Sequence, residues 1–195
     1  MPVVTALRAE PRGRVAVDLD GSAWRTLPTE PVLRAGLRVG CELDSPTVRR
    51  LRQELRRAEA LAVATRSLRS RDLSAHALDE RLQRADVAPS ARRDAVATLA
   101  RVGAIDDRRF AVARAHALAG RGYGDAAISA DLERRGISGG IRADALAGLE
   151  PEFDRARELV RRRGTGAKTA RFLASKGFGD DAVEAALGVG FANGP

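Results

Sequence analysis

Apolar and polar residues alternate in short runs near the N-terminus, a pattern typical of β-strands. The runs VVTALRAE and RVAVDL are joined by PRG, and Asp20-Gly21 marks a tight turn before SAWRTL. We therefore predict two or three small antiparallel strands, followed in TEPVLRAG by one or two helical turns that Gly36 ends. Because so small a sheet buries little surface alone, we expect it to lean on the next helix.

The pattern changes near residue 45 to that of a long amphipathic helix, expected to run from Ser45 towards Leu68. Ser45 is the candidate N-cap, and Pro46 suits the first turn. The apolar stripe consists of Val48, Leu51, Leu55 and Ala58. A separate basic stripe consists of Arg49, Arg52 and Arg56, widened by Arg50 and Arg57. Such a stripe is either a solvated face or a binding face, and the sequence leaves both alternatives open.

The rest of the chain is predicted to be helical and to repeat itself. The segments LDERLQRADV, ISADLERRGI and TARFLASKGF align, with spacings of 50 and then 41 residues. Four apolar positions recur: Leu82, Leu132 and Leu173; Val87, Ile137 and Phe178; Leu68, Leu118 and Leu159; and Val96, Leu146 and Leu187. Recurrent spacing of this kind indicates a stack of similar structural units.

Each unit is predicted to contain three helices. The elbows RSRDLS, AGRGYG and RRGTGA separate the first helix from the second. The second helix ends at Asp86, Gly136 or Gly177, and the two glycines suit left-handed caps. The third helix is expected to be short and to begin at Ser90, near Gly139 and at Asp180.

The fold class follows: mainly α, with tandem three-helix repeats and a small N-terminal β-hairpin or sheet. We predict a β-rich subdomain over 1–44, the long helix and repeat 1 over 45–102, and repeat 2 over 103–149. Repeat 3 is placed at 150–190, and a tail at 191–195.

Composition narrows the classes of function. One cysteine among 195 residues excludes an intramolecular disulfide, and no signal peptide or apolar run of membrane-spanning length is evident, so we expect a cytoplasmic protein. The net charge of +8 favours a nucleic acid or another anionic partner. However, 32 of the 34 basic residues are arginine, which is also typical of GC-rich genomes.

The stretch RRRGTGAKT resembles a phosphate-binding loop, but Arg162 and Ala167 stand where that motif needs glycine. We interpret the stretch as a repeat elbow, with Thr165 as a helix cap. His76 and His116 are isolated, and Asp106 of the Asp106-Asp107 pair is predicted to cap a helix. We therefore expect no catalytic residues, no cofactor and no metal, and hence no enzyme.

Basic side chains remain as candidate contacts to DNA or to a filament. Besides the basic stripe, these are Arg134, Arg135, Arg161, Arg162, Arg163, Lys168, Arg171 and Lys176. Tyr123 is either a residue that stacks on a base or a partly buried tyrosine.

Specific residues resemble the central repeat of the RecX family, which regulates the bacterial recombinase RecA. VGAIDDRRFAVARA followed by GDAAISADLERRGI carries the pattern, at Ile105, Asp106, Asp107, Arg109, Phe110, Ala111, Ile128, Leu132 and Gly136. LRSRDLSAHALDERLQRADV, VAVDLDGSAW and VLRAGLRVGCEL are similar to other parts of the family. Two departures are Arg114, where the family often has tyrosine, and Asp86, where the other repeats have glycine.

The resemblance implies a non-enzymatic regulator built as a curved array of repeats. It would bind RecA filaments on DNA, with the DNA single-stranded inside the filament, and mostly inhibit ATP hydrolysis and strand exchange. It implies a role in DNA repair, homologous recombination and the SOS response, for a monomer that needs no cofactor or membrane. The alternative is a general helical protein that binds single-stranded or double-stranded nucleic acid.

Overall fold

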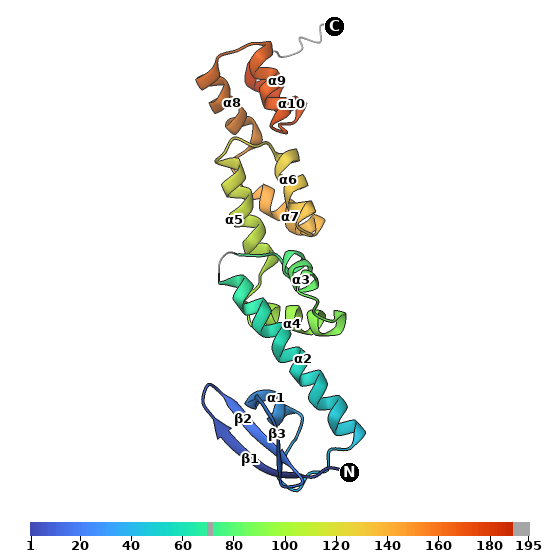
Figure 1. The fold of residues 1–195 in the computed structure, drawn as a ribbon. Coiled ribbons are helices and arrows are strands. Elements are labelled where there is room, and N and C mark those ends of the chain that lie inside the picture. Colours follow the sequence, from blue (N-terminus) through green and yellow to red (C-terminus); the bar gives the residue numbers. More distant parts are fainter. Residues whose placement is uncertain (70–71, 189–195) are drawn as a thin grey trace. The chain divides into compact units, whose positions relative to one another are not determined.

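The computed structural model describes residues 1–69 and 72–188 (Figure 1). The chain divides into two compact units. The first joins residues 1–71 to 78–102, and the second joins residues 72–77 to 103–195. The predicted tail at 191–195 lies outside the described residues, and the predicted division at residues 44, 102 and 149 stays a prediction.

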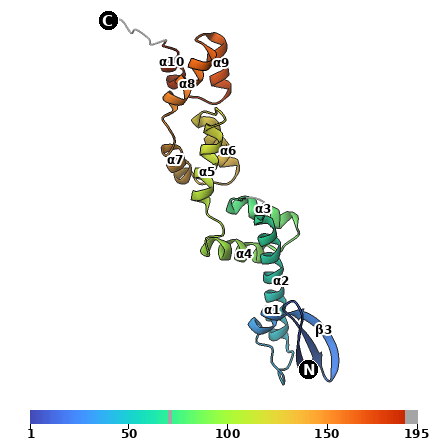
Figure 2. The ribbon, with the colours of Figure 1, turned by 90° about the vertical axis from the view of Figure 1, so that its left-hand side faces the viewer.

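The N-terminal sheet forms as expected from the alternating pattern. Strands β1 (Val4–Glu10), β2 (Arg14–Leu19) and β3 (Ser22–Pro28) pair antiparallel in the order β1-β2-β3. Helix α1 (Thr29–Arg34) contacts both β3 and α2 (Ser45–Leu68), so the sheet does lean on the long helix (Figures 1 and 2). Their shared core contains Val4, Val15, Val17, Leu27, Val32, Ala35, Leu37, Leu43 and Leu51.

The start of α2 corrects one prediction. The N-cap is Asp44 and not Ser45, because the Asp44 carboxylate accepts a hydrogen bond from the Thr47 N–H at 2.7 Å. Hydrogen bonding to Thr47, from its side chain first and its backbone N–H second, lowers the pKa of the Asp44 carboxyl. Ser45 already has helical backbone, and Pro46 lies in the first turn, where its missing N–H costs nothing.

The remaining helices form three sets. The first helices are α2, α5 (Asp107–Ala119) and α8 (Glu152–Arg163); the second are α3 (Ala75–Arg84), α6 (Asp125–Arg134) and α9 (Ala167–Ser175). The third are α4 (Pro89–Arg101), α7 (Gly139–Ala147) and α10 (Asp180–Leu187). In every set the first helix packs on the third, as α2 on α4, α5 on α7 and α8 on α10. The fold is therefore mainly α, as predicted.

Two further predicted helix starts are wrong. Helix α4 begins at Pro89 after Ala88, so Ser90 is its second residue and not its cap, and the helix extends to 13 residues. Helix α9 has Gly166 as its N-cap, with φ of 147°, so Thr165 lies one residue too early to cap it. Thr165 thus lies one position before the N-cap of its helix and Ser90 two positions after the N-cap of its own, so neither is the cap.

The end of the second helix has the same geometry in all three repeats. Leu82, Leu132 and Leu173 are each completely buried. Four residues later the backbone is left-handed, with φ of 57° at Asp86, 74° at Gly136 and 79° at Gly177. The following N–H then donates back to the leucine carbonyl at 3.1, 3.1 and 3.2 Å, from Val87, Ile137 and Phe178 respectively. This is a Schellman cap, so Asp86 performs the role that glycine has in the other repeats.

In the second unit, the start of α6 docks on the end of α9. The Gly124 N–H donates to the Lys176 carbonyl at 2.9 Å, and the Asp125 N–H donates to Glu152 Oε1 at 2.6 Å. A Cβ atom at Gly124 would lie only 2.3 Å from the Gly177 carbonyl oxygen. This close backbone approach therefore requires glycine.

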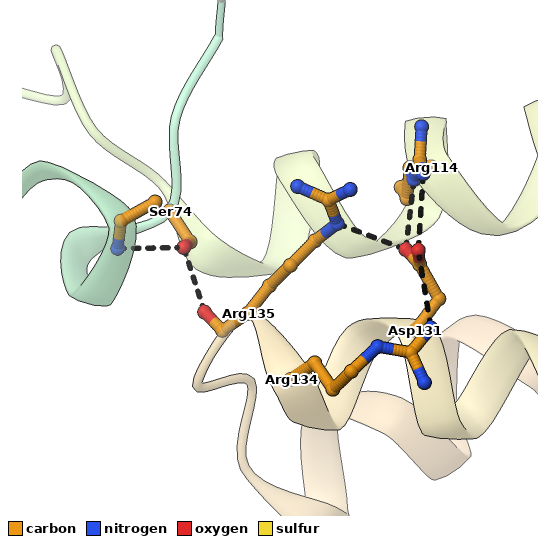
Figure 3. Close-up of polar contacts among 6 residues, drawn as sticks. Ser74, Arg114, Asp131, Arg134 and Arg135 are labelled. Carbon is orange, nitrogen blue, oxygen red and sulfur yellow. Dashed lines mark hydrogen bonds and ion pairs between the residues drawn. The ribbon is translucent and has the colours of Figure 1, made fainter.

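The residues before α3 make an equivalent junction in the same unit. Ser74 Oγ donates to the Arg135 carbonyl at 2.7 Å (Figure 3). The Ala75 N–H donates to Asp107 Oδ1 at 2.8 Å. Ser74 is fully buried, and a Cβ atom at Gly136 would lie 2.4 Å from that of His76. In both junctions, the start of a second helix is bonded to a backbone carbonyl at the end of the second helix of the following repeat, and to an acidic side chain.

We expect Gly124→Ala to destabilise the chain by about 1–3 kcal/mol, because the added methyl group must displace backbone atoms. Gly140→Ala is the matched control, since nothing lies within 4 Å of a Cβ atom there. That change should be neutral or stabilise by up to about 1 kcal/mol through helix propensity. Urea denaturation measures both, and equal midpoints for the two variants would contradict the junction.

Candidate nucleic-acid interface

The basic stripe of α2 lies along a groove beside α4. Arg49, Arg52, Arg56 and Arg57 line an opening of about 350 Å³ together with Gln53 of α2 and Ser90, Ala91 and Asp94 of α4. We call this the arginine groove. Arg49, Arg52 and Arg56 are exposed, and none of them makes an ion pair within residues 1–69 and 72–188. This exposure fits a solvated face and a binding face alike, so the basic stripe as a binding face stays a prediction.

The groove continues towards the end of α4. A neighbouring opening of about 310 Å³ shares Arg57 and Asp94 with the first and adds Ala97, Thr98 and Arg101. Arg57 donates to Thr98 Oγ1 at 3.5 Å, while Arg101 is exposed. The sequence did not single out Arg101, because only the packing of α4 on α2 brings it to the same opening as Arg57, and no sequence spacing indicates that proximity.

Arg134 and Arg135, at the end of α6, surround a carboxylate. Asp131 accepts two hydrogen bonds from Arg114, at 2.8 and 3.0 Å, and one from Arg135 at 2.9 Å (Figure 3). Arg134 lies 3.7 Å away and is 70% exposed, whereas the Asp131 side chain is only 15% exposed. Arg135 therefore stabilises the repeat, and Arg134 alone of the two projects into solvent.

The same cluster explains a departure from the family pattern. Arg114 is half-buried and forms a bidentate ion pair with Asp131, so it has a partner that a tyrosine at this position could not bind in the same way. The hydrogen bonds from Arg114, with those from Arg135, hold the pKa of the Asp131 carboxyl well below its usual range.

The elbow of repeat 3 carries basic residues in different states. Arg161 and Arg162 both pair with Glu158 of α8, Arg162 at 2.7 Å. Arg163 lies over the Phe172 ring, 3.8 Å from its centroid. Each is exposed, but each has an intramolecular partner.

The other basic residues of this repeat also differ. Lys176 covers the Tyr123 ring at 4.2 Å, and Tyr123 packs against the core of repeat 2, so Tyr123 is a partly buried tyrosine. Lys168 and Arg171 are exposed and make no ion pair in the part of the chain that the structure describes. As DNA or filament contacts, all of these residues stay predictions.

The paired carboxylates Asp106 and Asp107 have separate structural roles. Asp106 caps its own helix by accepting from the Arg109 N–H at 3.0 Å, as predicted, while Asp107 accepts from Ala75. The bond from the Arg109 backbone lowers the pKa of the Asp106 carboxyl. Among the described residues no three His, Cys, Asp or Glu side chains gather as a metal site. No helix described here is both long and apolar enough to cross a membrane.

Comparison with known proteins identifies relatives that share most of the chain. The family model described as "RecX, second three-helix domain" matches residues 106–146. The "Regulatory protein RecX" of Xanthomonas citri is 32% identical over 148 residues, which cover 71% of this chain and 89% of the relative. The protein of the same name from Stenotrophomonas maltophilia is 32% identical over 155 residues, covering 73% and 93%.

Solved structures show the same fold. A crystal structure of a regulatory protein RecX superposes with a TM-score of 0.83 at 19% identity, covering 97% of this chain and all of the other. RecX from Lactobacillus salivarius gives a TM-score of 0.61 at 17% identity, covering 69% of this chain and 96% of the other.

We expect Asp131→Asn to cost about 1–3 kcal/mol of unfolding free energy at neutral pH, because it weakens charged hydrogen bonds to a mostly buried group. Folding lowers the pKa of the Asp131 carboxyl, so ionised Asp131 stabilises the folded state. This stabilisation is complete above the unfolded-state pKa of about 4 and is lost as the pH falls towards the folded-state pKa. Urea unfolding of both proteins at several pH values measures this.

The difference in unfolding free energy between wild type and Asp131→Asn should decrease as the pH falls from 6 to 3, because protonation removes the stabilisation that the carboxylate provides. Asp94→Asn is the control, because Asp94 is exposed and makes no ion pair within the described ranges. A difference for Asp131→Asn that stays constant with pH would show that the carboxylate does not act through its charge.

Proposed function

The chain belongs to the RecX family of regulatory proteins, and on this basis we propose that it binds RecA-type recombinase filaments on DNA and restrains their ATP hydrolysis and strand exchange. The observation that carries the proposal is the 32% identity over 71% of the chain to a regulatory protein RecX. The protein acts as a cytoplasmic monomer, without cofactor or catalysis of its own.

Three physical features support this function. Tandem repeats present the same kind of small structural unit several times along the chain, which suits a partner that is itself a repeating polymer. The net charge of +8 and the exposed arginines suit a filament whose DNA is negatively charged. The paired carboxylates are engaged in helix capping and a junction, which supports a regulatory role over a catalytic one.

The direct test is ATP hydrolysis by the cognate recombinase on single-stranded DNA, titrated with this protein and repeated with excess DNA. We expect inhibition that survives the excess, because the target is the assembled filament. Inhibition that disappears with excess DNA would mean that the protein only competes for DNA. The alternative, a general nucleic-acid-binding protein, would then replace the proposal.

The elbow of repeat 3 can be tested in the same assay. We expect the Arg161→Ala, Arg162→Ala, Arg163→Ala triple variant to inhibit less than wild type while remaining folded. Exposed substitutions cost at most about 0.5 kcal/mol each, with up to about 1 kcal/mol for the stacked Arg163. Circular dichroism checks the fold.

The control for this test replaces three exposed, ion-paired arginines elsewhere, Arg34, Arg84 and Arg108, by alanine. It removes the same charge from other places. If the elbow variant inhibits as strongly as this control and wild type, repeat 3 is not a contact surface.

A further inference from the structure

We propose that the arginine groove binds the sugar–phosphate backbone of DNA directly, and does so without a recombinase. The inference deepens the proposed function by assigning DNA contact to one place on the first unit. It rests on that function only for its biological setting, because the binding itself is a property of the chain alone.

The groove carries positive charge that few carboxylates compensate. Five arginines line the continuous groove, namely Arg49, Arg52, Arg56, Arg57 and Arg101, against the single carboxylate of Asp94. Apart from Arg57, which donates to Thr98, these arginines have neither a hydrogen-bond nor an ion-pair partner among the described residues. A groove lined by charges of one sign concentrates the electrostatic potential and attracts the opposite charge.

The positive charges of the groove lie in a row along α2. Arg49, Arg52 and Arg56 follow one face of α2 and span about 10 Å at 1.5 Å per residue. A row of cations along a helix matches a polymer with regularly spaced negative charges better than it matches a single small anion. Gln53 and Ser90 add hydrogen-bond donors of the kind that contact phosphate oxygens.

The residues that line the groove favour DNA over a protein partner. The only apolar residues that line the groove are Ala91 and Ala97. Stable protein interfaces depend on large buried anchors, such as tryptophan, tyrosine or other apolar side chains, and the groove offers none of these. Its guanidinium groups instead favour phosphate, to which arginine donates in a bidentate manner.

Four arginines of the second unit provide a contrast. Arg114 and Arg135 are held by Asp131, while Arg161 and Arg162 are held by Glu158. Phosphate would have to displace a carboxylate at these sites, whereas at Arg49, Arg52 and Arg56 it displaces only water. The groove also lies outside residues 106–146, so the family-model match does not include it.

The test is fluorescence anisotropy of labelled single-stranded DNA with the full chain and no recombinase, from about 50 to 200 mM salt. We compare wild type with the Arg49→Ala, Arg52→Ala, Arg56→Ala triple variant. The logarithm of the binding constant falls linearly with the logarithm of the salt concentration, and each phosphate contact contributes about 0.7 to that slope. Loss of three contacts should therefore make the slope shallower by about 2. Affinity at low salt should fall about tenfold or more, since each exposed charge contact contributes a few-fold.

Three controls keep the result specific. The Arg34, Arg84, Arg108 alanine variant removes the same charge and should retain the wild-type slope. The Arg49→Lys, Arg52→Lys, Arg56→Lys variant should restore most of the slope, because a phosphate contact needs the charge while a packing role would not be rescued. The alanine triple variant should lose affinity equally for oligothymidine and for a mixed-sequence strand of the same length, since phosphate contacts carry no sequence information.

Equal loss in the groove and control variants would overturn the proposal, because it would reflect net charge alone. Binding of DNA by the groove variant with wild-type affinity would also overturn the proposal. If that variant also no longer inhibited the recombinase, the groove would be a contact for protein. Failure of the ATPase test together with groove-dependent DNA binding would leave this inference standing and remove only the proposed filament function.

Discussion

The repeats depend on one backbone constraint, the left-handed residue that ends each second helix. At Gly136 and Gly177 the positive φ turns the chain so that the next apolar residue folds back over the buried leucine. The same turn presents the preceding carbonyl, of Arg135 or Lys176, to a donor from the previous repeat. A helix end leaves such carbonyls without partners, and a neighbouring helix start lacks acceptors. Each junction therefore satisfies two helix ends at once.

This constraint explains which residue occupies the left-handed position. A Cβ atom at Gly136 would lie 2.4 Å from that of His76, and one at Gly177 would lie 2.6 Å from that of Ala127. Glycine is thus required twice over, by backbone angle and by space. Asp86 has the same angle but is exposed, so only the modest cost of a left-handed aspartate applies. The departure from glycine in repeat 1 is therefore a consequence of its surroundings.

Sequence patterns predicted the elements well because burial imposes periodicity. The leucines at 82, 132 and 173 are fully buried as their alignment indicated, and the sheet rests on α2 as its size required. Helix α2 begins at Ser45 as predicted, but its cap is one residue earlier, at Asp44, and the cap of α4 is two residues before Ser90. Several nearby residues can supply a cap, and only backbone geometry selects one. The bond from Ala75 to Asp107 was not predictable, because it joins residues 32 positions apart.

The candidate site was less predictable, for a reason that concerns arginine itself. A sequence gives every arginine the same charge, but a guanidinium that holds a junction is not available to a ligand. Arg155 is the extreme case, with a side chain only 9% exposed that pairs with Asp125 and donates to the Tyr123 carbonyl at 2.8 Å. Arg49 and Arg52 occupy a helix face that no junction uses, so their charge remains available. The distribution of carboxylates, more than that of arginines, thus determines where the net charge of +8 can act.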